Sequence, residues 1–372
     1  MNLESARRRI QELDRAILER VAERTRLASE VARIKMANDL PTVDYRQERR
    51  VLERGRDIAH ETDLDPNLAE ELLSSLMSAS VTEQEARRLR FAATGKGKTA
   101  VVVGGAGRMG RWMVDFLGAQ EFEVAVLDPA APGGVDVAAR DLLPAADLVV
   151  CAAPPGRTAR LYLEWARTPF EGVVCDMASI KSPLIEAIGV LQSAGFRVAS
   201  FHPLFGPDTA ALRGCDVVVC DTGDAEAEKM VSGLFTPTSA RLVRVSLDEH
   251  DRLMADMLTL AHATTLAFAG ALLEGEERRL ELHSTTDRAL ERLAGTLVRE
   301  SPEVYFEIQA DNPYSGEAVS RLQRAIERLR DLVERRDLAA FSTWMGQAAR
   351  RLPIAPSAVA GSGGRRRTPR SG

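Results

Sequence analysis

The spacing of apolar residues changes twice along the chain and divides it into three parts. Residues 1–91 show almost no strand pattern and have the spacing of helices. From residue 99 to about 246, short apolar runs alternate mostly with helical segments, which is typical of a largely parallel sheet covered on both faces. From 247 to 352 the helical spacing returns. The predicted strands are Ala100–Val103, Glu123–Leu127, Leu148–Ala152, Val173–Asp176, Arg197–Phe201, Asp216–Cys220 and Arg241–Val245.

These parts predict a multidomain α and α/β protein: a three-helix domain, a doubly wound Rossmann-like domain and an all-helical domain. In the first domain we expect a long helix to about Met36 and two more helices after Pro41 and Pro66. A charged stretch follows, and we place a linker at residues 92–98. Residues 353–372 are rich in Pro, Ala, Ser, Gly and Arg and favour a disordered basic tail.

Composition places the chain among ordinary soluble globular proteins. It has 372 residues, 45% of them hydrophobic and 28% charged, with a net charge of -5, so neither nucleic acid nor a membrane is expected as a partner. The N-terminus lacks the apolar core of a signal peptide, and no later apolar run is expected to reach the length that spans a bilayer, which predicts a cytoplasmic protein. Buried, reduced thiols and no metal site are predicted for Cys151, Cys175, Cys215 and Cys220.

Two cations of the first helix lie in or beside its apolar stripe. Arg24 and Lys35 are eleven residues apart, which is three helical turns or about 16 Å, enough to bracket a small dianion. Because unpaired buried charge is costly, an anion should meet them. Pairing with acidic side chains of the other helices, or snorkelling, is the alternative. The stripe consists of Ile10, Leu13, Ile17, Val21 and Val31.

Residues 3–88 resemble the all-helical chorismate mutases. The resemblance implies that Arg24 and Arg7 hold the two carboxylates of chorismate, and that Lys35 and Gln84 donate to its ether oxygen. Glu48 would accept the ring hydroxyl. The matching positions are Arg7, Arg24, Lys35, Asp44, Glu48, Ser80 and Gln84, of which Asp44 and Ser80 complete the substrate-binding set.

Arg7 precedes Arg24 by seventeen residues, about 25 Å along one helix, so both cannot reach one small molecule from a straight helix. Arg7 should therefore serve the site of a second subunit, which predicts an intertwined homodimer. One position departs from the family, because Gln47 stands where an arginine is common, with Arg46 and Arg49 on either side.

A glycine-rich loop follows the first predicted strand and opens a helix. Gly105, Gly107 and Gly110, with Arg108 and Met109 between them, fit the turn that brings backbone N–H groups to a pyrophosphate. Asp128 ends the next strand, where a carboxylate binds a ribose 2′-hydroxyl and repels a 2′-phosphate. No arginine follows in Pro129–Pro132, so NAD is the predicted cofactor. The alternative is a Rossmann-like domain whose loop holds no nucleotide.

His202 lies where an apolar strand runs into the Pro/Gly-rich sequence Phe201–Asp208. Ligands of open α/β sheets bind beyond such strand ends. This sequence and the loop Asp176–Lys181 resemble prephenate dehydrogenases, and the resemblance covers about residues 99–350. It implies that His202 takes the proton of the substrate's ring hydroxyl while Ser179 shares that hydrogen bond.

The same resemblance makes residues 247–352 a substrate-binding and dimerisation domain. It implies that Arg288 grips a substrate carboxylate and that His262 lies near the substrate. Spacing alone leaves Arg288 open to a solvated position, because it falls on the face opposite Leu290, Leu293 and Leu297. His250, with Asp251, is either a substrate neighbour or a helix-start residue.

The combined hypothesis is a bifunctional enzyme of tyrosine biosynthesis that makes prephenate and oxidises it to 4-hydroxyphenylpyruvate. A dehydrogenase that takes arogenate is the first alternative. In the second, the N-terminal domain is a non-catalytic sensor of chorismate-like ligands, which agrees with Gln47. A generic 3-hydroxyacid dehydrogenase is the last, and it leaves residues 1–91 unexplained.

Overall fold

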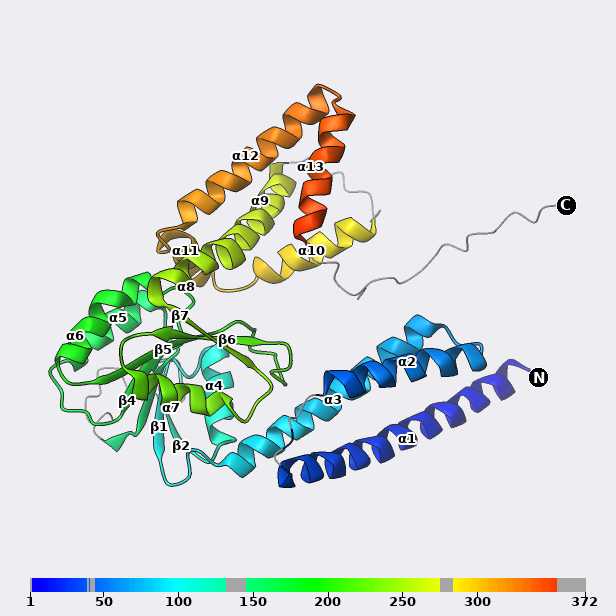
Figure 1. Ribbon diagram of the computed structural model, residues 1–372, viewed down its shortest axis with the longest axis horizontal. Coiled ribbons are helices and arrows are strands. Elements are labelled where there is room, and N and C mark those ends of the chain that lie inside the picture. Colours follow the sequence, from blue (N-terminus) through cyan, green and yellow to red (C-terminus); the bar gives the residue numbers. More distant parts are fainter. Residues whose placement is uncertain (1, 39, 41–43, 132–144, 275–283, 353–372) are drawn as a thin grey trace. The chain divides into compact units, whose positions relative to one another are not determined.

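The computed structural model describes residues 2–38, 40, 44–131, 145–274 and 284–352 (Figure 1). The chain divides into two compact units, Met1–Ser315 and a second that begins at Gly316, and each is described by itself.

The first unit opens with the three predicted helices, α1 (Leu3–Ala37), α2 (Tyr45–Glu61) and α3 (Pro66–Ala92). The Asp44 side chain caps α2 by accepting from the backbone N–H groups of Arg46 and Gln47. Both α1 and α2 pack against α3. The prediction of three helices here is confirmed.

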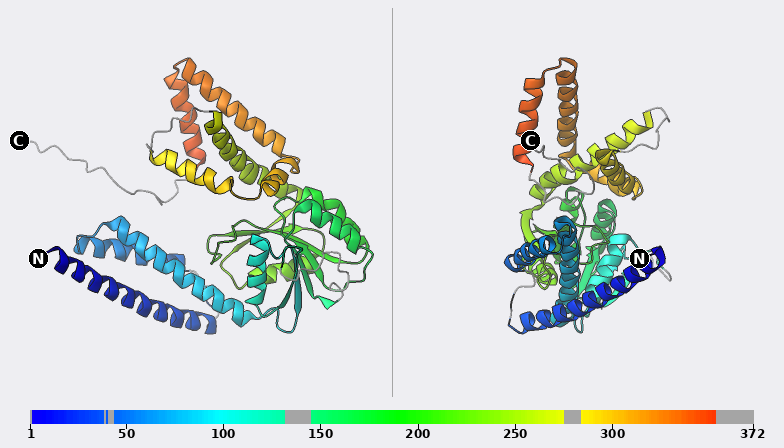
Figure 2. Two further views of the ribbon diagram at one scale, coloured as in Figure 1. Left: turned by 180° about the vertical axis from the view of Figure 1, so that it is seen from behind. Right: turned by 90° about the vertical axis from the view of Figure 1, so that its right-hand side faces the viewer.

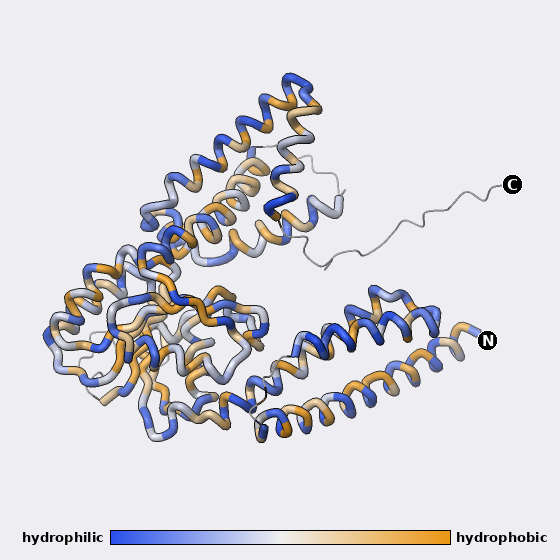
Figure 3. The backbone as a smooth tube through the Cα atoms, in the orientation of Figure 1, coloured by the Kyte–Doolittle hydropathy of each residue, from blue (hydrophilic) through white to orange (hydrophobic). Residues whose placement is uncertain are grey.

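The apolar stripe of α1 is not buried by the chain itself. Ile10, Leu13, Ile17 and Val31 are 57%, 47%, 59% and 47% exposed, so within a single chain this stripe does not face a core. Figure 3 shows apolar positions recurring along the whole helix. The face that packs on α3 is a neighbouring one, where Ala32 is buried and Arg24 reaches α3.

A seven-stranded sheet follows, in the order β2-β1-β3-β4-β5-β6-β7. Its first five strands run parallel, β6 is antiparallel to β5, and β7 is parallel to β6. The prediction of a largely parallel sheet is therefore confirmed. The strands are β1 (Thr99–Val103), β2 (Glu123–Leu127), β3 (Leu148–Cys151), β4 (Val173–Asp176), β5 (Arg197–Pro203), β6 (Asp216–Asp221) and β7 (Arg241–Ser246).

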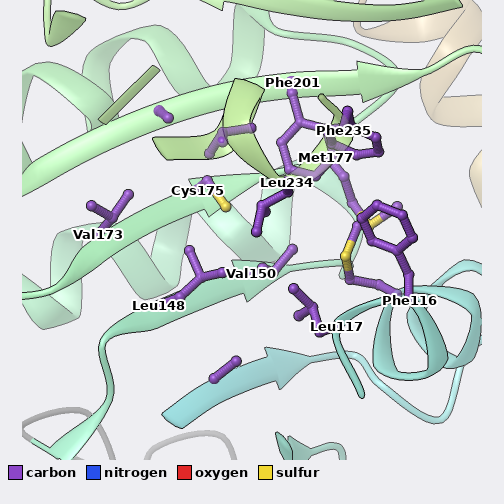
Figure 4. Close-up of a cluster of buried hydrophobic side chains, with 14 of the residues drawn as sticks. Phe116, Leu117, Leu148, Val150, Val173, Cys175, Met177, Phe201, Leu234 and Phe235 are labelled. Atoms are coloured by element: carbon purple, nitrogen blue, oxygen red, sulfur yellow. The ribbon is translucent and has the colours of Figure 1, made fainter. Parts of the chain in front are cut away.

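Alternating side chains of these strands build a core on each face of the sheet. Val101, Val149 and Val174 pack toward α5 (Pro155–Trp165) and α6 (Ile185–Ser193). On the other face, α4 (Arg108–Gly118) and α7 (Ala225–Phe235) cover the intervening residues. Figure 2 shows the helices on both sides, and Figure 4 shows Phe116, Leu117, Leu234 and Phe235 gathered over the second face.

All four cysteines are free thiols, as predicted. Cys151, Cys175 and Cys220 are buried, whereas Cys215, which immediately precedes β6, is only half-buried. Burial raises the pKa of the Cys220 thiol to about 12, so this thiol stays protonated at neutral pH.

Beyond β7 the described chain is helical, as predicted. It comprises α8 (Leu247–Met254), a π-helical turn (Ala255–Thr259), α9 (Leu260–Glu274), α10 (Thr285–Leu297) and α11 (Pro302–Ala310). Because α8, the π-helical turn and α9 join end to end, Leu247–Glu274 is long and apolar enough to cross a membrane. The expectation that no segment reaches that length is therefore wrong. Length and composition alone are weak evidence for a membrane span, since core helices of soluble proteins can have both. Of the most apolar 18 residues of this segment, 11% are buried.

The second unit continues α12 (Ser315–Glu334) and adds α13 (Leu338–Arg351). The Asp337 side chain caps α13, and the Arg328 guanidinium lies 5.7 Å from the ring centre of Trp344, which joins the two helices. The predicted basic tail, 353–372, lies outside the described residues.

Candidate active sites

His202 lies near the end of β5, in the row where the carboxyl ends of five parallel strands meet. Its side chain is buried. The loop after β4, which contains the half-buried Ser179, is adjacent because β4 pairs with β5. The two segments predicted to form the dehydrogenase centre thus come from neighbouring strands.

Two residues of α8 complete a buried chain of hydrogen bonds to His202. His202 Nδ1 lies 3.1 Å from His250 Nε2, and His250 Nδ1 lies 2.8 Å from Asp251 Oδ1. His250 and Asp251 are fully buried. Describing His250 as a helix-start residue is correct for its place in α8, whose N-cap is Ser246, but it misses this contact.

Buried charged side chains fix the loop after β4 beside these hydrogen-bonded histidines. Lys181 Nζ donates to Asp176 Oδ1 at 2.7 Å and to the Phe201 carbonyl at 2.8 Å, and both charged side chains are fully buried. The Asp251 carboxylate accepts from the backbone N–H groups of Lys181 and Ser182 at 2.8 and 2.7 Å. The loop is therefore fixed both to β5 and to α8.

The surroundings favour neutral histidines beside an ionised aspartate. Burial, with smaller contributions from His250 and Lys181, holds the pKa of His202 well below its ordinary value. Burial also lowers the pKa of His250, although the Asp251 carboxylate opposes it. Burial acts to raise the pKa of Asp251, but hydrogen bonds from His250, Ser182 and the backbone outweigh it and hold that pKa low.

The glycine loop has the close packing that a dinucleotide site requires. A side chain at Gly110 would meet the Gly104 carbonyl at 2.1 Å, and one at Gly105 would meet Val126 at 2.7 Å. Gly107 is the N-cap of α4 and supplies no capping side chain, and the first turn of α4 has no acid, so its N–H groups suit an anion. Gly104, not singled out from the sequence, has φ +78°, which requires glycine, and lies against the loop after β3.

Asp128 lies beside this loop at the end of β2. Its carboxylate accepts from Ala106 N at 3.0 Å and from Ala130 N at 2.9 Å, and the side chain remains partly exposed. Arg108 does not point to a free phosphate position in this structure: it pairs with Asp208 at 2.9 Å and with Glu300. Met109 packs against the core below the loop.

Two further predicted residues lie on the helices after the sheet. His262 is half-buried on α9, its ring 4.7 Å from that of Tyr305, and its buried Nδ1 lacks a hydrogen-bond partner among the described residues. Burial lowers the pKa of His262. Arg288 is exposed in the first turn of α10.

Arg24 lies between the helices of the N-terminal domain. Its Nη1 donates to Ser80 Oγ and to the Leu76 carbonyl, both at 2.9 Å. Its partners on α3 are therefore neutral acceptors, and no acidic side chain among the described residues, the alternative considered above, pairs with it. Gln84 lies one turn beyond Ser80 on α3, and its buried Oε1 has no partner among the described residues. Arg24 of α1 therefore meets the face of α3 that carries Ser80 and Gln84.

The remaining predicted mutase residues lie at the ends of α1 and α2. The Asp44 pKa is lowered chiefly by the Gln47 N–H, with Arg46 N–H and the Lys35 charge also contributing against desolvation. Glu48 forms an ion pair with Arg213, from the segment between β5 and β6. Arg7 is exposed on α1, and no side-chain partner is found for it in the described part of the chain.

Three residues that hold these sites in place were given no role from the sequence, namely Asp176, Lys181 and Glu85. Asp176 and Lys181 are the first and last residues of the loop that was singled out, and a charged pair at the end of an apolar strand was the available signal. Glu85 is buried on α3 and accepts from Leu212 N at 2.7 Å and Ser239 N at 2.8 Å, which ties α3 to the sheet domain. Nothing in its local sequence predicts those distant partners.

Comparison with known proteins identifies relatives of both parts. Residues 6–85 match the family model of type II chorismate mutases. A T-protein of Enterobacter agglomerans is 28% identical over 362 residues, 95% of each chain. A 4-amino-4-deoxyprephenate dehydrogenase of Streptomyces pristinaespiralis is 32% identical over 268 residues, 65% of this chain and 87% of that relative. Both resemblances drawn from the sequence are confirmed.

The fold has solved counterparts. The prephenate dehydrogenase of Aquifex aeolicus, crystallised with hydroxyphenyl propionate and NAD+, superposes with a TM-score of 0.58 at 17% identity. The match covers 68% of this chain and 96% of that one. A Synechocystis arogenate dehydrogenase superposes with a TM-score of 0.52, also at 17% identity, over 68% of this chain and 98% of that one. At such identities these matches establish the fold alone.

Proposed function

We propose that this chain, which belongs to the family of bifunctional chorismate mutase/prephenate dehydrogenases, rearranges chorismate to prephenate and oxidises prephenate to 4-hydroxyphenylpyruvate. The observation that carries the dehydrogenase half is the buried His202 at the strand ends, hydrogen-bonded to the His250–Asp251 pair. Arg24 beside Ser80 and Gln84 carries the mutase half.

In the dehydrogenase, His202 is the proposed general base. Its lowered pKa keeps the imidazole neutral at physiological pH, as a base requires. It takes the proton of the ring hydroxyl while the carbon that bears this hydroxyl loses a hydride to NAD. Carbon dioxide then departs with its bonding electrons left in the ring, and the phenolate of the aromatic product recovers the proton from His202. Ser179 is proposed to share the hydrogen bond to the hydroxyl, with Arg288 and His262 binding the rest of the substrate.

NAD is the cofactor, and when bound it accepts the hydride. The proposed pyrophosphate site is the start of α4, where Gly105, Gly107 and Gly110 leave the backbone unobstructed. Arg108 and Met109 flank that site. Asp128 is proposed to bind the ribose hydroxyls, exchanging its contact with Ala106 N for them.

In the mutase, the reaction is pericyclic and needs no nucleophile, so positioning and charge supply the acceleration. Arg24 and the partner chain's Arg7 are proposed to hold the carboxylates. Lys35 and Gln84 donate to the ether oxygen as negative charge develops on it. Glu48 accepts the ring hydroxyl, for which it must leave Arg213, and Asp44 and Ser80 position these groups.

A homodimer in the cytoplasm is the proposed state. The exposed apolar stripe of α1 and exposed apolar side chains of α9 and α10, such as Leu273 and Leu293, supply surface for a second copy. The first helical turns of the segment Leu247–Glu274 contain His250 and Asp251, which are buried at the dehydrogenase centre, so we assign the segment to the globular fold.

The test measures both activities in one variant. His202→Asn should lower NADH formation from prephenate by about 10²–10⁴, the usual contribution of a general base, and leave chorismate consumption without NAD unchanged. Near-normal NADH formation would refute the assignment of the base. Wild-type assays with prephenate and arogenate decide the substrate. Loss of chorismate turnover with binding retained would identify the N-terminal domain as a sensor.

A further inference from the structure

The buried chain Asp251–His250–His202 has a direction that its donors and acceptors determine. Asp251 accepts from Lys181 N and from the backbone and hydroxyl of Ser182. Because both of its oxygens accept from backbone N–H groups and these hydrogen bonds hold its pKa low, Asp251 is an ionised carboxylate, which has no proton to give. The 2.8 Å contact with His250 must therefore be donated by His250 Nδ1–H.

The proton on His250 Nδ1 fixes the next link. A neutral imidazole carries one N–H, so the other nitrogen, His250 Nε2, holds a lone pair. The 3.1 Å contact with His202 must then be donated by His202 Nδ1–H. It follows that Nε2 of His202 is the nitrogen that bears a lone pair.

Burial and the Lys181 charge keep both rings neutral. The Lys181 ammonium is fully buried in the loop after β4, held by Asp176 of β4, and a cation there disfavours a second proton on either histidine. On the other side Asp251 of α8 stabilises one N–H of His250. Cys220 of β6, which is also titratable, is a buried thiol and carries no charge at neutral pH.

We propose that His250 and Asp251 are positioning residues that hold His202 in the tautomer whose Nε2 can accept the substrate proton. A triad aspartate acts on its histidine in the same way, by orientation and choice of tautomer, without taking the proton itself. When Nε2 takes the proton, Nδ1–H continues to donate to His250, and the proton returns to the phenolate by the same nitrogen. The meaning of this tautomer for catalysis rests on the proposed dehydrogenase function, but the tautomer itself does not.

A purely structural role for the pair is the alternative that the test must exclude. Asp251 also ties Lys181 and Ser182 to α8, and the Asn312 side chain donates to its carbonyl at 2.8 Å. The first measurement is therefore independent of activity. The chain has five histidines, few enough for their ring nitrogens to be resolved by ¹⁵N NMR of histidine-labelled protein. His202→Asn and His250→Gln assign the signals.

For the wild type we expect an unprotonated Nε2 and a protonated Nδ1 on His202 at neutral pH. In His250→Phe, which removes the acceptor, both tautomers of His202 should appear. A protonated Nε2 in the wild type, or an unchanged tautomer in His250→Phe, would overturn the inference.

The second measurement compares two substitutions of one residue. The glutamine amide in His250→Gln offers an oxygen to His202 and an N–H to Asp251, whereas phenylalanine in His250→Phe offers neither. We expect kcat with prephenate to fall on the order of 10² in the phenylalanine variant, to be at least tenfold higher in the glutamine variant, and KM to stay within threefold in both. Equal losses in the two variants, or a change in KM alone, would indicate a structural role.

His60, exposed on α2, provides the matched control, because His60→Phe and His60→Gln should leave kcat and KM unchanged. The proposed function and this inference fail separately. A wild type that forms no NADH from prephenate or arogenate refutes the function, while the NMR result still decides the tautomer.

Discussion

The two candidate active sites differ in how much of each a single chain completes. At the dehydrogenase centre, His202, His250 and Asp251 are buried and hydrogen-bonded to one another, and Lys181 is held by Asp176. Within the described part of the N-terminal domain, Arg24 donates only to neutral acceptors, a buried oxygen of Gln84 has no partner, and the α1 stripe is exposed.

This difference follows from the chemistry that each site performs. A base must hold one protonation state before substrate arrives, so its partners have to be built into the fold. A pericyclic site needs donors aimed at an anion, and the anion itself satisfies them when it binds. A preorganised centre should therefore lose stability when a partner is removed, whereas the mutase face should lose turnover and keep its stability.

Removing Lys181 tests the first half of this expectation. Lys181→Met leaves the Asp176 carboxylate buried without its cation, which should lower the free energy of unfolding by about 3–5 kcal/mol. Chemical denaturation at pH 7 measures this. The double variant Asp176→Leu/Lys181→Met removes both charges and should recover most of the loss. If the single and double variants were equally unstable, packing rather than the ion pair would be responsible.

Removing Arg24 tests the second half. Arg24→Ala should lower the mutase kcat/KM by about 10²–10³, the effect of losing one preorganised donor, and leave NADH formation from prephenate unchanged. Arg20→Ala is the matched control, since Arg20 lies one turn earlier on α1 and pairs with Glu23 in solvent. A large loss of folding stability in Arg24→Ala, or comparable mutase losses in both variants, would contradict the comparison.

The sequence predicted the parts of both sites that depend on local pattern. Alternating apolar runs located all seven strands, and the placement of His202 followed because the end of a parallel strand is a fixed feature of such folds. The partners of His202 could not be derived in the same way. His250 and His202 are 48 residues apart, and only the packing of α8 against β6 and the loop after β4 brings them together.

The same limit applies to the burial of α1. Periodicity identified its apolar stripe, but not whether the chain itself or a second copy covers it. Likewise, Arg24 and Ser80 were predicted to share a site, whereas the ion pair between Glu48 and Arg213 depends on tertiary contacts over 165 residues. The local sequence pattern identifies which residues share a helix face, whereas the tertiary structure determines which residues contact that face.

Glu85 of α3 connects the N-terminal helices to the sheet domain. Glu85→Gln replaces one carboxylate oxygen by an N–H donor that would face the backbone N–H of Leu212 or Ser239, so the free energy of unfolding should fall by about 1–3 kcal/mol. Glu83→Gln, in an exposed ion pair on the same helix, should change it by no more than about 0.5 kcal/mol. Equal effects of the two variants would mean that Glu85 does not join the domains.

The smallest expected effect concerns pH. A histidine with an ordinary pKa of about 6.5 would be about three-quarters protonated at pH 6, and a base of that kind would lose about fourfold in rate. The pKa of His202 lies well below that value, because burial and the Lys181 charge disfavour its cation, so the neutral, active form persists as the pH falls.

We therefore expect the dehydrogenase kcat/KM to stay nearly constant from pH 8 to pH 6 and to fall only at lower pH. The free energy of unfolding should also decrease as the pH falls. Unfolding restores the ordinary pKa, so between that value and the lower folded value the unfolded chain binds more protons, and the free energy of unfolding decreases as the pH falls through this window. Parallel pH profiles of kcat/KM and of denaturation check both statements. A fourfold loss of activity at pH 6 with undiminished stability would show that His202 titrates as an exposed histidine, and that the dehydrogenase centre is no more preorganised than the mutase face.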